Sequence, residues 1–314
     1  MDSIAWCASK WCATIRPSRS PPTRERATRA GTWRRTAALL GWSASLAAVV
    51  WGMVRLEREA HAPRPDVPCE LEWVDLPVWL MNDSSGRILR AIAAAADPGA
   101  GVALGDPDLC RRITEGLQRS PWVAEVQRVS KQADGRIRVR ALYREPFALV
   151  EVNGSAYLID RAGVRLPVRY DVAKVEDHYW NDWFCVVAVA DDIPAEGAAW
   201  GGADLAAGLR LIEFLKEAAA RGEVPFRSSL RKIDVANYKL RQDKLDGELR
   251  IRTVYPAGYI NWGLPPGEEY NIEASAGRKL EMLRALYKER GELPDVILDV
   301  RGAEGIRVVK PRRG

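Results

Sequence analysis

Residues 120–143, SPWVAEVQRVSKQADGRIRVRALY, decide the fold because they form the pattern of two β-strands joined by a tight turn. In the first half, Trp122, Ala124 and Val126 occupy alternate positions, which is typical of one face of a strand. The second half alternates between apolar residues and arginines, namely Ile137, Val139, Ala141 and Tyr143 against Arg136, Arg138 and Arg140. Asp134-Gly135 favours a two-residue hairpin turn. We therefore predict an antiparallel hairpin with one core face and one basic face.

Before this hairpin the pattern predicts a strand and two helices. Residues 69–80 are strand-like, Ser84 or Ser85 can cap the first helix, and Asp108 can cap the second. The residues that share a core-facing side are Ile88, Ile92 and Ala95 in the first helix and Leu109, Ile113 and Leu117 in the second. The first folded unit, 69–145, is thus expected to have the order β-α-α-β-β.

After the hairpin, residues 146–310 are expected to form a second folded unit. The elements predicted there are a hairpin over 148–159 that turns at Asn153-Gly154, strands at 185–189, 233–235, 249–254, 296–301 and 306–309, and helices from Asp204 and Ala276. The apolar stripes of the two helices are Leu205, Leu209, Ile212 and Leu215, and Ala276, Leu280, Leu283 and Tyr287. We assign the α+β class, with a mixed, mainly antiparallel sheet, flanking helices and a short tail at 311–314.

Towards the N-terminus, residues 36–54 form a run of nineteen residues without a charge. As a helix rising about 1.5 Å per residue, this run is long enough to cross a hydrocarbon core of about 30 Å. A cleaved secretory signal is the alternative, because Ala60-His61-Ala62 is an A-x-A site. The length of the run and Pro63 directly after the site favour an uncleaved membrane anchor. The Pro-rich segment 55–68 is then a linker.

The charges that flank this run predict its orientation. Residues 1–35 carry eight Lys/Arg against two acids, so this basic tail, expected to be disordered, stays in the cytoplasm and the folded units lie outside. The same tail accounts for most of the excess behind the calculated pI of 9.0, so we expect no nucleic-acid binding. A basic segment beside a membrane favours contact with anionic lipid headgroups.

The five cysteines do not predict a disulfide framework. Cys7 and Cys12 lie in the tail, and Cys69, Cys110 and Cys185 leave an odd number outside the anchor. A bond between Cys69 and Cys110 and free, buried thiols both remain open. No Cys/His spacing typical of zinc occurs.

No motif of an enzyme is present: the sequence lacks G-x-S-x-G, a P-loop and G-x-G-x-x-G, so we expect no catalysis and no cofactor. The nearest candidate metal ligands are Glu176, Asp177, His178, Asp182, Asp191 and Asp192. We interpret them as a solvated acidic loop rather than a metal site. In the same loop Trp180 and Trp183 could form a docking patch or pack onto the sheet. Arg136, Arg138 and Arg140 could likewise bind an acidic partner or form a solvated face.

Three segments follow one another in the order found in a known family. They are SPWVAEVQRVSK (120–131), REPFALVEVNGSAYLIDRAGV (144–164) and KLEMLRALYKERGELPDVILDVRGAEGIRVV (279–309). Together they resemble the FtsQ/DivIB family of bacterial cell-division proteins over about residues 69–310. The resemblance implies a POTRA (polypeptide-transport-associated) domain at 69–145 and the family's β-domain at 146–310, both outside the cytoplasmic membrane. Two departures are Gly302, where the family often has an aromatic residue, and the unusual loop 168–184.

The same resemblance implies a non-enzymatic scaffold that links single-span division proteins of the FtsB and FtsL kind at the division site. The chain is then a single-pass protein of the inner membrane with its bulk in the periplasm. In the family a partner adds a strand at the C-terminal end, and the matching positions here are Arg301, Gly305, Ile306, Arg307 and Val308. An ordinary closing hairpin is the alternative for this segment. For the whole protein the alternatives are a membrane-anchored periplasmic hydrolase or metal-dependent enzyme, and a POTRA-type transport adaptor.

Overall fold

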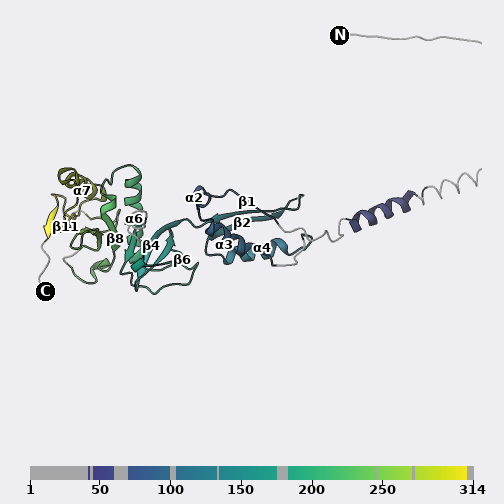
Figure 1. Cartoon of the computed structure of the whole chain (residues 1–314), viewed down its shortest axis with the longest axis horizontal. Helices are drawn as coiled ribbons and strands as arrows, with labels where there is room; N and C mark the ends of the chain where they lie inside the picture. Colours follow the sequence, from purple (N-terminus) through teal and green to yellow (C-terminus); the bar gives the residue numbers. More distant parts are fainter. Residues whose placement is uncertain are drawn as a thin grey trace, which may run out of the picture. The chain divides into compact units, whose positions relative to one another are not determined.

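The computed structural model describes residues 42, 45–59, 70–99, 104–132, 134–174, 183–244, 247–270 and 273–309. The chain divides into two compact units, 1–63 and 64–314. In the first unit, residues 45–59 are helical, so the helix continues five residues beyond the predicted end of the span at Val54 (Figure 1). Among the helices that the structure describes, none is both long enough and apolar enough to cross a membrane.

The second unit begins with a small mixed sheet and its helices. In chain order these are β1 (Leu71–Val74), α2 (Val78–Met81), α3 (Arg87–Ala96), α4 (Leu109–Arg119), β2 (Val123–Lys131) and β3 (Ile137–Tyr143). The sheet has the order β1-β3-β2, with β1 parallel and β2 antiparallel to β3 (Figure 1). The predicted order β-α-α-β-β is confirmed, with the short helix α2 as an additional element between β1 and α3.

Two local predictions in this part differ from the structure. The strand predicted over 69–80 ends at Val74, because Asp75 has a positive φ of 59° and α2 follows directly. Gly86, and not a serine, is the N-cap residue of α3, although the Ser85 hydroxyl accepts the first helical amide, that of Arg87, at 3.3 Å. The Asp83 carboxylate accepts the Ile88 amide at 3.1 Å. Hydrogen bonds to this carboxylate, led by the one from the Ser85 hydroxyl, lower the pKa of Asp83.

The hairpin itself departs from strict alternation. Val123 is buried and Ala124 is exposed, because two irregularities in the β2–β3 pairing shift the side chains between the faces. The connection is longer than the predicted two-residue turn: β2 ends at Lys131 and β3 begins at Ile137. Gly135 has a positive φ of 90°, and the Gln132 amide donates to the Arg136 carbonyl at 2.8 Å across the connection.

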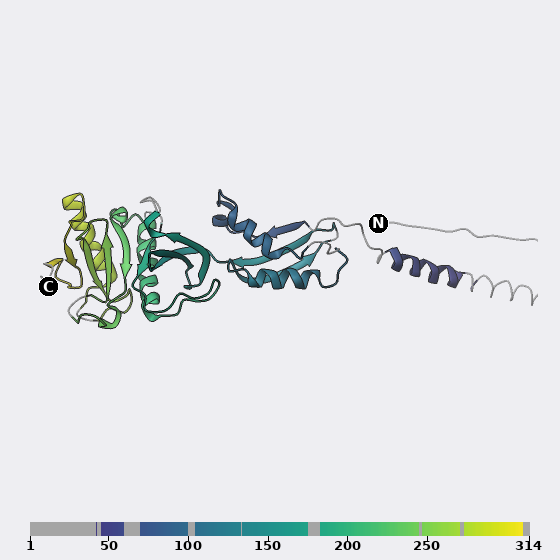
Figure 2. The ribbon, with the colours of Figure 1, turned by 60° about the horizontal axis from the view of Figure 1, so that its bottom comes forward.

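The rest of the second unit forms a mixed sheet of nine strands. Its elements are β4 (Pro146–Val152), β5 (Ser155–Asp160), β6 (Arg165–Asp171), β7 (Cys185–Val187), α6 (Ala203–Ala220), β8 (Leu230–Asp234), β9 (Leu249–Thr253), β10 (Tyr259–Gly263), α7 (Ala276–Arg290), β11 (Ile297–Asp299) and β12 (Arg307–Val309). The strand order is β12-β11-β10-β9-β8-β7-β4-β5-β6. Figure 2 shows these strands side by side, from the teal strands β4–β6 to the green and yellow-green strands that follow. The α+β class is confirmed, and β6 and β10 are strands that the sequence patterns did not predict.

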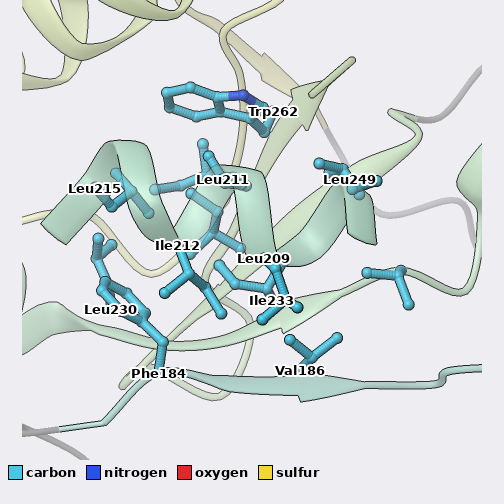
Figure 3. Packing of buried hydrophobic residues seen from close by; sticks show 14 of the residues in the cluster. Phe184, Val186, Leu209, Leu211, Ile212, Leu215, Leu230, Ile233, Leu249 and Trp262 are labelled. Carbon is cyan, nitrogen blue, oxygen red and sulfur yellow. The ribbon is translucent and has the colours of Figure 1, made fainter. Parts of the chain in front are cut away.

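Helices α6 and α7 share one core with one face of the large sheet. The predicted stripe of α6 is buried, and Figure 3 shows Leu209 and Ile212 between this helix and the strands that carry Val186 and Ile233. The stripe of α7 is buried except for Tyr287, which is partly exposed. Gly291, with a positive φ of 78°, ends α7 as a left-handed cap. Both helices thus pack into the same core beside the large sheet.

Candidate partner-binding edge

The C-terminal strand β12 is the last strand of the nine-stranded sheet. It pairs antiparallel with β11, and no other strand in the described part of the chain pairs with its outer side. The strand was predicted from Ile306, but it begins at Arg307, and the Ile306 side chain just before it packs against the main core. Gly305 has a φ of 151°, a value that favours glycine in the turn before the strand. Within the described residues, the outer side of β12 is thus an open sheet edge.

Hydrogen bonds on the inner side of β11 show which groups of β12 face outward. The Val300 amide donates to the Asn261 carbonyl of β10 at 3.3 Å. Because successive amides point to opposite sides of a strand, the Asp299 amide points to β12, where Asp299 lies opposite Arg307. This pair therefore forms the antiparallel hydrogen bonds. Val308, one residue further, directs its N–H and C=O towards the open edge.

The side chains of β12 also face solvent. Val308 is 64% exposed, although Leu298 directly opposite it on β11 is only 2% exposed and lies in the core. Arg307 is exposed as well, with Glu304 as a distant ion-pair partner at 4.0 Å. An added strand would therefore meet unpaired backbone groups, one apolar side chain and one cation.

Arg301, which the resemblance assigns to partner binding, is held by Asp299. Its guanidinium donates two hydrogen bonds to that carboxylate, at 2.9 and 2.6 Å. Burial opposes ionisation of Asp299, but the hydrogen bonds from Arg301 outweigh it and keep the pKa of Asp299 below its usual value. Gly302 forms an isolated bridge with Glu273. The structure thus places Arg301 beside the edge as part of an internal ion pair.

Arg136, just before β3, and Arg138 and Arg140 within it lie on the solvent face, as predicted, but acids from β1 and its flanks pair with each of them. Arg136 contacts Glu70 at 3.2 Å, Arg138 contacts Glu72 at 3.1 Å, and Arg140 contacts Asp75 at 3.0 Å. Exposed ion pairs of this kind add little stability, yet the three carboxylates neutralise the positive charge of the three arginines. This arrangement favours the solvated face over a docking surface for an acidic partner.

Trp183 is partly buried and packs against the apolar cluster that includes Leu149 of β4 and Leu158 of β5. The Lys216 ammonium lies 5.5 Å from the Trp183 ring and 4.3 Å from the Phe147 ring, and it donates to the Phe147 carbonyl. Packing onto the sheet, the second of the two alternatives, is therefore what the structure shows for Trp183. Trp180 lies outside the described residues.

The Lys216 contact predicts a pH effect on stability. Burial, reinforced by the nearby Arg227 charge, lowers the pKa of Lys216 to about 8 from 10.5. Between these two values the unfolded chain binds a proton that the folded chain does not, so the free energy of unfolding rises with pH, by about 1 kcal/mol for a partly exposed amine. Urea unfolding of the unit 64–314 at pH values from about 7.5 to 10 measures this rise. Lys216→Met should remove it, and an identical pH profile in both proteins would refute the assignment.

No group of three or more His, Cys, Asp or Glu side chains suited to a metal occurs within the described ranges. Asp191 and Asp192 are exposed. The other candidate ligands of the acidic loop, Glu176, Asp177, His178 and Asp182, lie outside the described residues. Cys110 and Cys185 are free thiols, Cys110 half-buried and Cys185 buried, which favours the alternative of free thiols over a Cys69–Cys110 bond. Cys69 itself lies outside the described residues.

Fold and edge together define an α+β protein whose largest sheet ends in an exposed C-terminal strand. Comparison of the chain with models of protein families gives no match, and comparison with curated proteins gives none either.

Proposed function

We propose that the protein is a non-enzymatic, membrane-anchored scaffold of the bacterial division machinery, similar in role to the FtsQ/DivIB family. Its POTRA-like part corresponds to the small sheet and its β-domain to the large one. The partners are single-span division proteins of the FtsB and FtsL kind, and one of them adds a β-strand to β12. The open edge of β12, with the outward N–H of Val308, is the observation that carries this proposal.

Several features support strand addition at this position. β12 is short and ends just before Lys310-Pro311, so proline limits continuation of the strand and the basic residues limit pairing with arbitrary chains. Main-chain hydrogen bonds supply affinity whatever the side chains are, so Gly302 can stand where the family often has an aromatic residue. The exposed Arg307 favours a partner segment with an acidic residue opposite it.

Val308→Pro tests the proposal, because it removes the outward N–H while the hydrogen bonds between Arg307 and Asp299 remain. Val308→Ala is the matched control, since it shortens the same exposed side chain and keeps the N–H. Tagged full-length proteins would be captured from the membrane fraction of dividing cells and their partners measured by mass spectrometry. We expect division proteins with the wild type and Val308→Ala, and at least about tenfold less with Val308→Pro.

Either of two results would contradict the proposal. One is full recovery of the same partners by a Val308→Pro protein whose melting temperature matches that of the wild type. The other is recovery of the chain itself in the soluble fraction, which would remove the membrane anchor.

A further inference from the structure

A fully buried lysine lies behind the strands that carry the edge. Lys279 of α7 is 0% exposed, and its ammonium donates to the Glu273 carboxylate while lying 5.1 Å from the Trp262 ring of β10. Burial lowers the pKa of Lys279, and the hydrogen bond to Glu273 opposes this effect. A charged lysine without solvent contact is costly unless it is paired. Lys279 therefore needs its ion pair with Glu273, and the contacts of Glu273 show which segments this ion pair connects.

Glu273 connects three segments of the unit. Its Oε1 atom accepts the Leu264 amide just after β10 at 2.8 Å, as well as the Lys279 ammonium of α7. Its backbone forms the antiparallel bridge with Gly302, and the next amide, that of Ala274, donates to the Arg301 carbonyl at 2.7 Å. The short segment 273–274 is thus tied to β10 and α7 on one side and to the end of β11 on the other.

Gly263 shows how closely these groups approach one another. It has a φ of 92°, and a Cβ atom placed on it would lie 2.2 Å from Glu273 Oε1 and 2.9 Å from Arg301 Cγ. No residue with a side chain fits at this position, so the backbone of β10, the carboxylate and the stem of Arg301 form one tight contact. Arg301 and Gly302 are the residues from which the chain turns from β11 to β12.

We propose that Glu273 and Lys279 are positioning residues for the open edge: as a buried clamp they hold segment 273–274 against Arg301 and Gly302. This contact sets the point at which β11 ends and so the pairing of the β11–β12 hairpin. β12 itself has only three residues and one neighbouring strand, so the hairpin depends on such support. The consequence for partner binding rests on the proposed function, whereas the effect on the hairpin does not.

The test compares the full-length wild type with Glu273→Gln/Lys279→Met. Lys279→Met alone would leave the Glu273 carboxylate buried without its cation and lower the stability of the whole unit, whereas the double variant buries no charge. Lys216→Met is the control, because it removes a partly buried lysine whose ammonium contacts Phe147 of β4, and five strands separate β4 from β12 in the sheet. Native-state hydrogen exchange is measured at the hairpin amides of Asp299 and Arg307, with β8 and β9 as internal reference.

In the double variant we expect exchange at the hairpin amides to be at least about tenfold faster, with exchange in β8 and β9 and the melting temperature unchanged. Lys216→Met should leave the hairpin amides as in the wild type. Unchanged hairpin exchange in the double variant would overturn the proposal. Equal acceleration in the hairpin and in the reference strands would do so too, because it indicates a general loss of stability.

Capture of partners separates this inference from the proposed function. If Val308→Pro abolishes capture, the double variant should also capture at least severalfold less, and undiminished capture would overturn the positioning role. If Val308→Pro captures normally, strand addition is refuted, and the exchange experiment alone decides whether the clamp holds the hairpin.

Discussion

Replacing Trp122 by alanine is expected to lower the free energy of unfolding by about 3–5 kcal/mol. The Trp122 side chain is 3% exposed and belongs to the same apolar cluster as Ile92 of α3 and Leu117 of α4. It lies at the point where the chain leaves α4 and enters β2, so its removal opens a cavity under both helices. Urea unfolding of the unit 64–314, followed by circular dichroism, measures the change.

A matched control for this experiment is Tyr270→Ala, because that aromatic side chain is 72% exposed. We expect a change within about 0.5 kcal/mol for Tyr270→Ala. A Trp122→Ala protein as stable as the Tyr270→Ala protein would show that Trp122 is not part of the core.

Gly116→Ala should destabilise the protein by about 1–3 kcal/mol, although alanine is ordinarily the better helix former by about 1 kcal/mol. A Cβ atom on Gly116 of α4 would lie 2.1 Å from the Ala95 carbonyl oxygen of α3. The carbonyl oxygen is a main-chain atom and the Cβ atom is fixed to the main chain. No change of side-chain rotamer can therefore relieve the overlap, and the two helices must separate. The measurement is the same urea unfolding of the unit 64–314.

Gly277→Ala is the control with the opposite expected sign. Gly277 lies in α7, and a Cβ atom there would meet no other atom within 4 Å. We expect this substitution to stabilise the protein by up to about 1 kcal/mol, because it only reduces the freedom of the unfolded chain. A stabilising effect at Gly116 as well would mean that α3 and α4 are further apart than described.

Helices and their buried faces could be predicted because their signals are local. The stripe Leu109, Ile113 and Leu117 needs only the helical period to identify a face, and all three residues are buried. The turn at Asn153-Gly154 was predicted on the same basis, and both residues have positive φ values there, of 50° and 74°. In each case the relevant neighbours lie within a few positions along the chain.

The candidate site could be predicted only in part. The resemblance implied strand addition near the C-terminal end, but the outward direction of Val308 follows from hydrogen bonds between β10 and β11. Glu273 and Lys279 were not predicted at all. A lysine three residues after Ala276, on the buried side of α7, was the one signal available for this pair.

By itself, the sequence determined the positions of the long helices and the solvent face of the β3 arginines. It also determined the α+β class, in which strands and helices occur both before and after residue 145. Tertiary structure decided the irregular pairing of β2, the strand β10 within the sheet, the pairing of each β3 arginine with an acid and the clamp at Glu273. The physical reason is range. Periodicity and turn conformation depend on adjacent residues, whereas register, ion pairs and the cost of a buried charge depend on segments that only folding brings together.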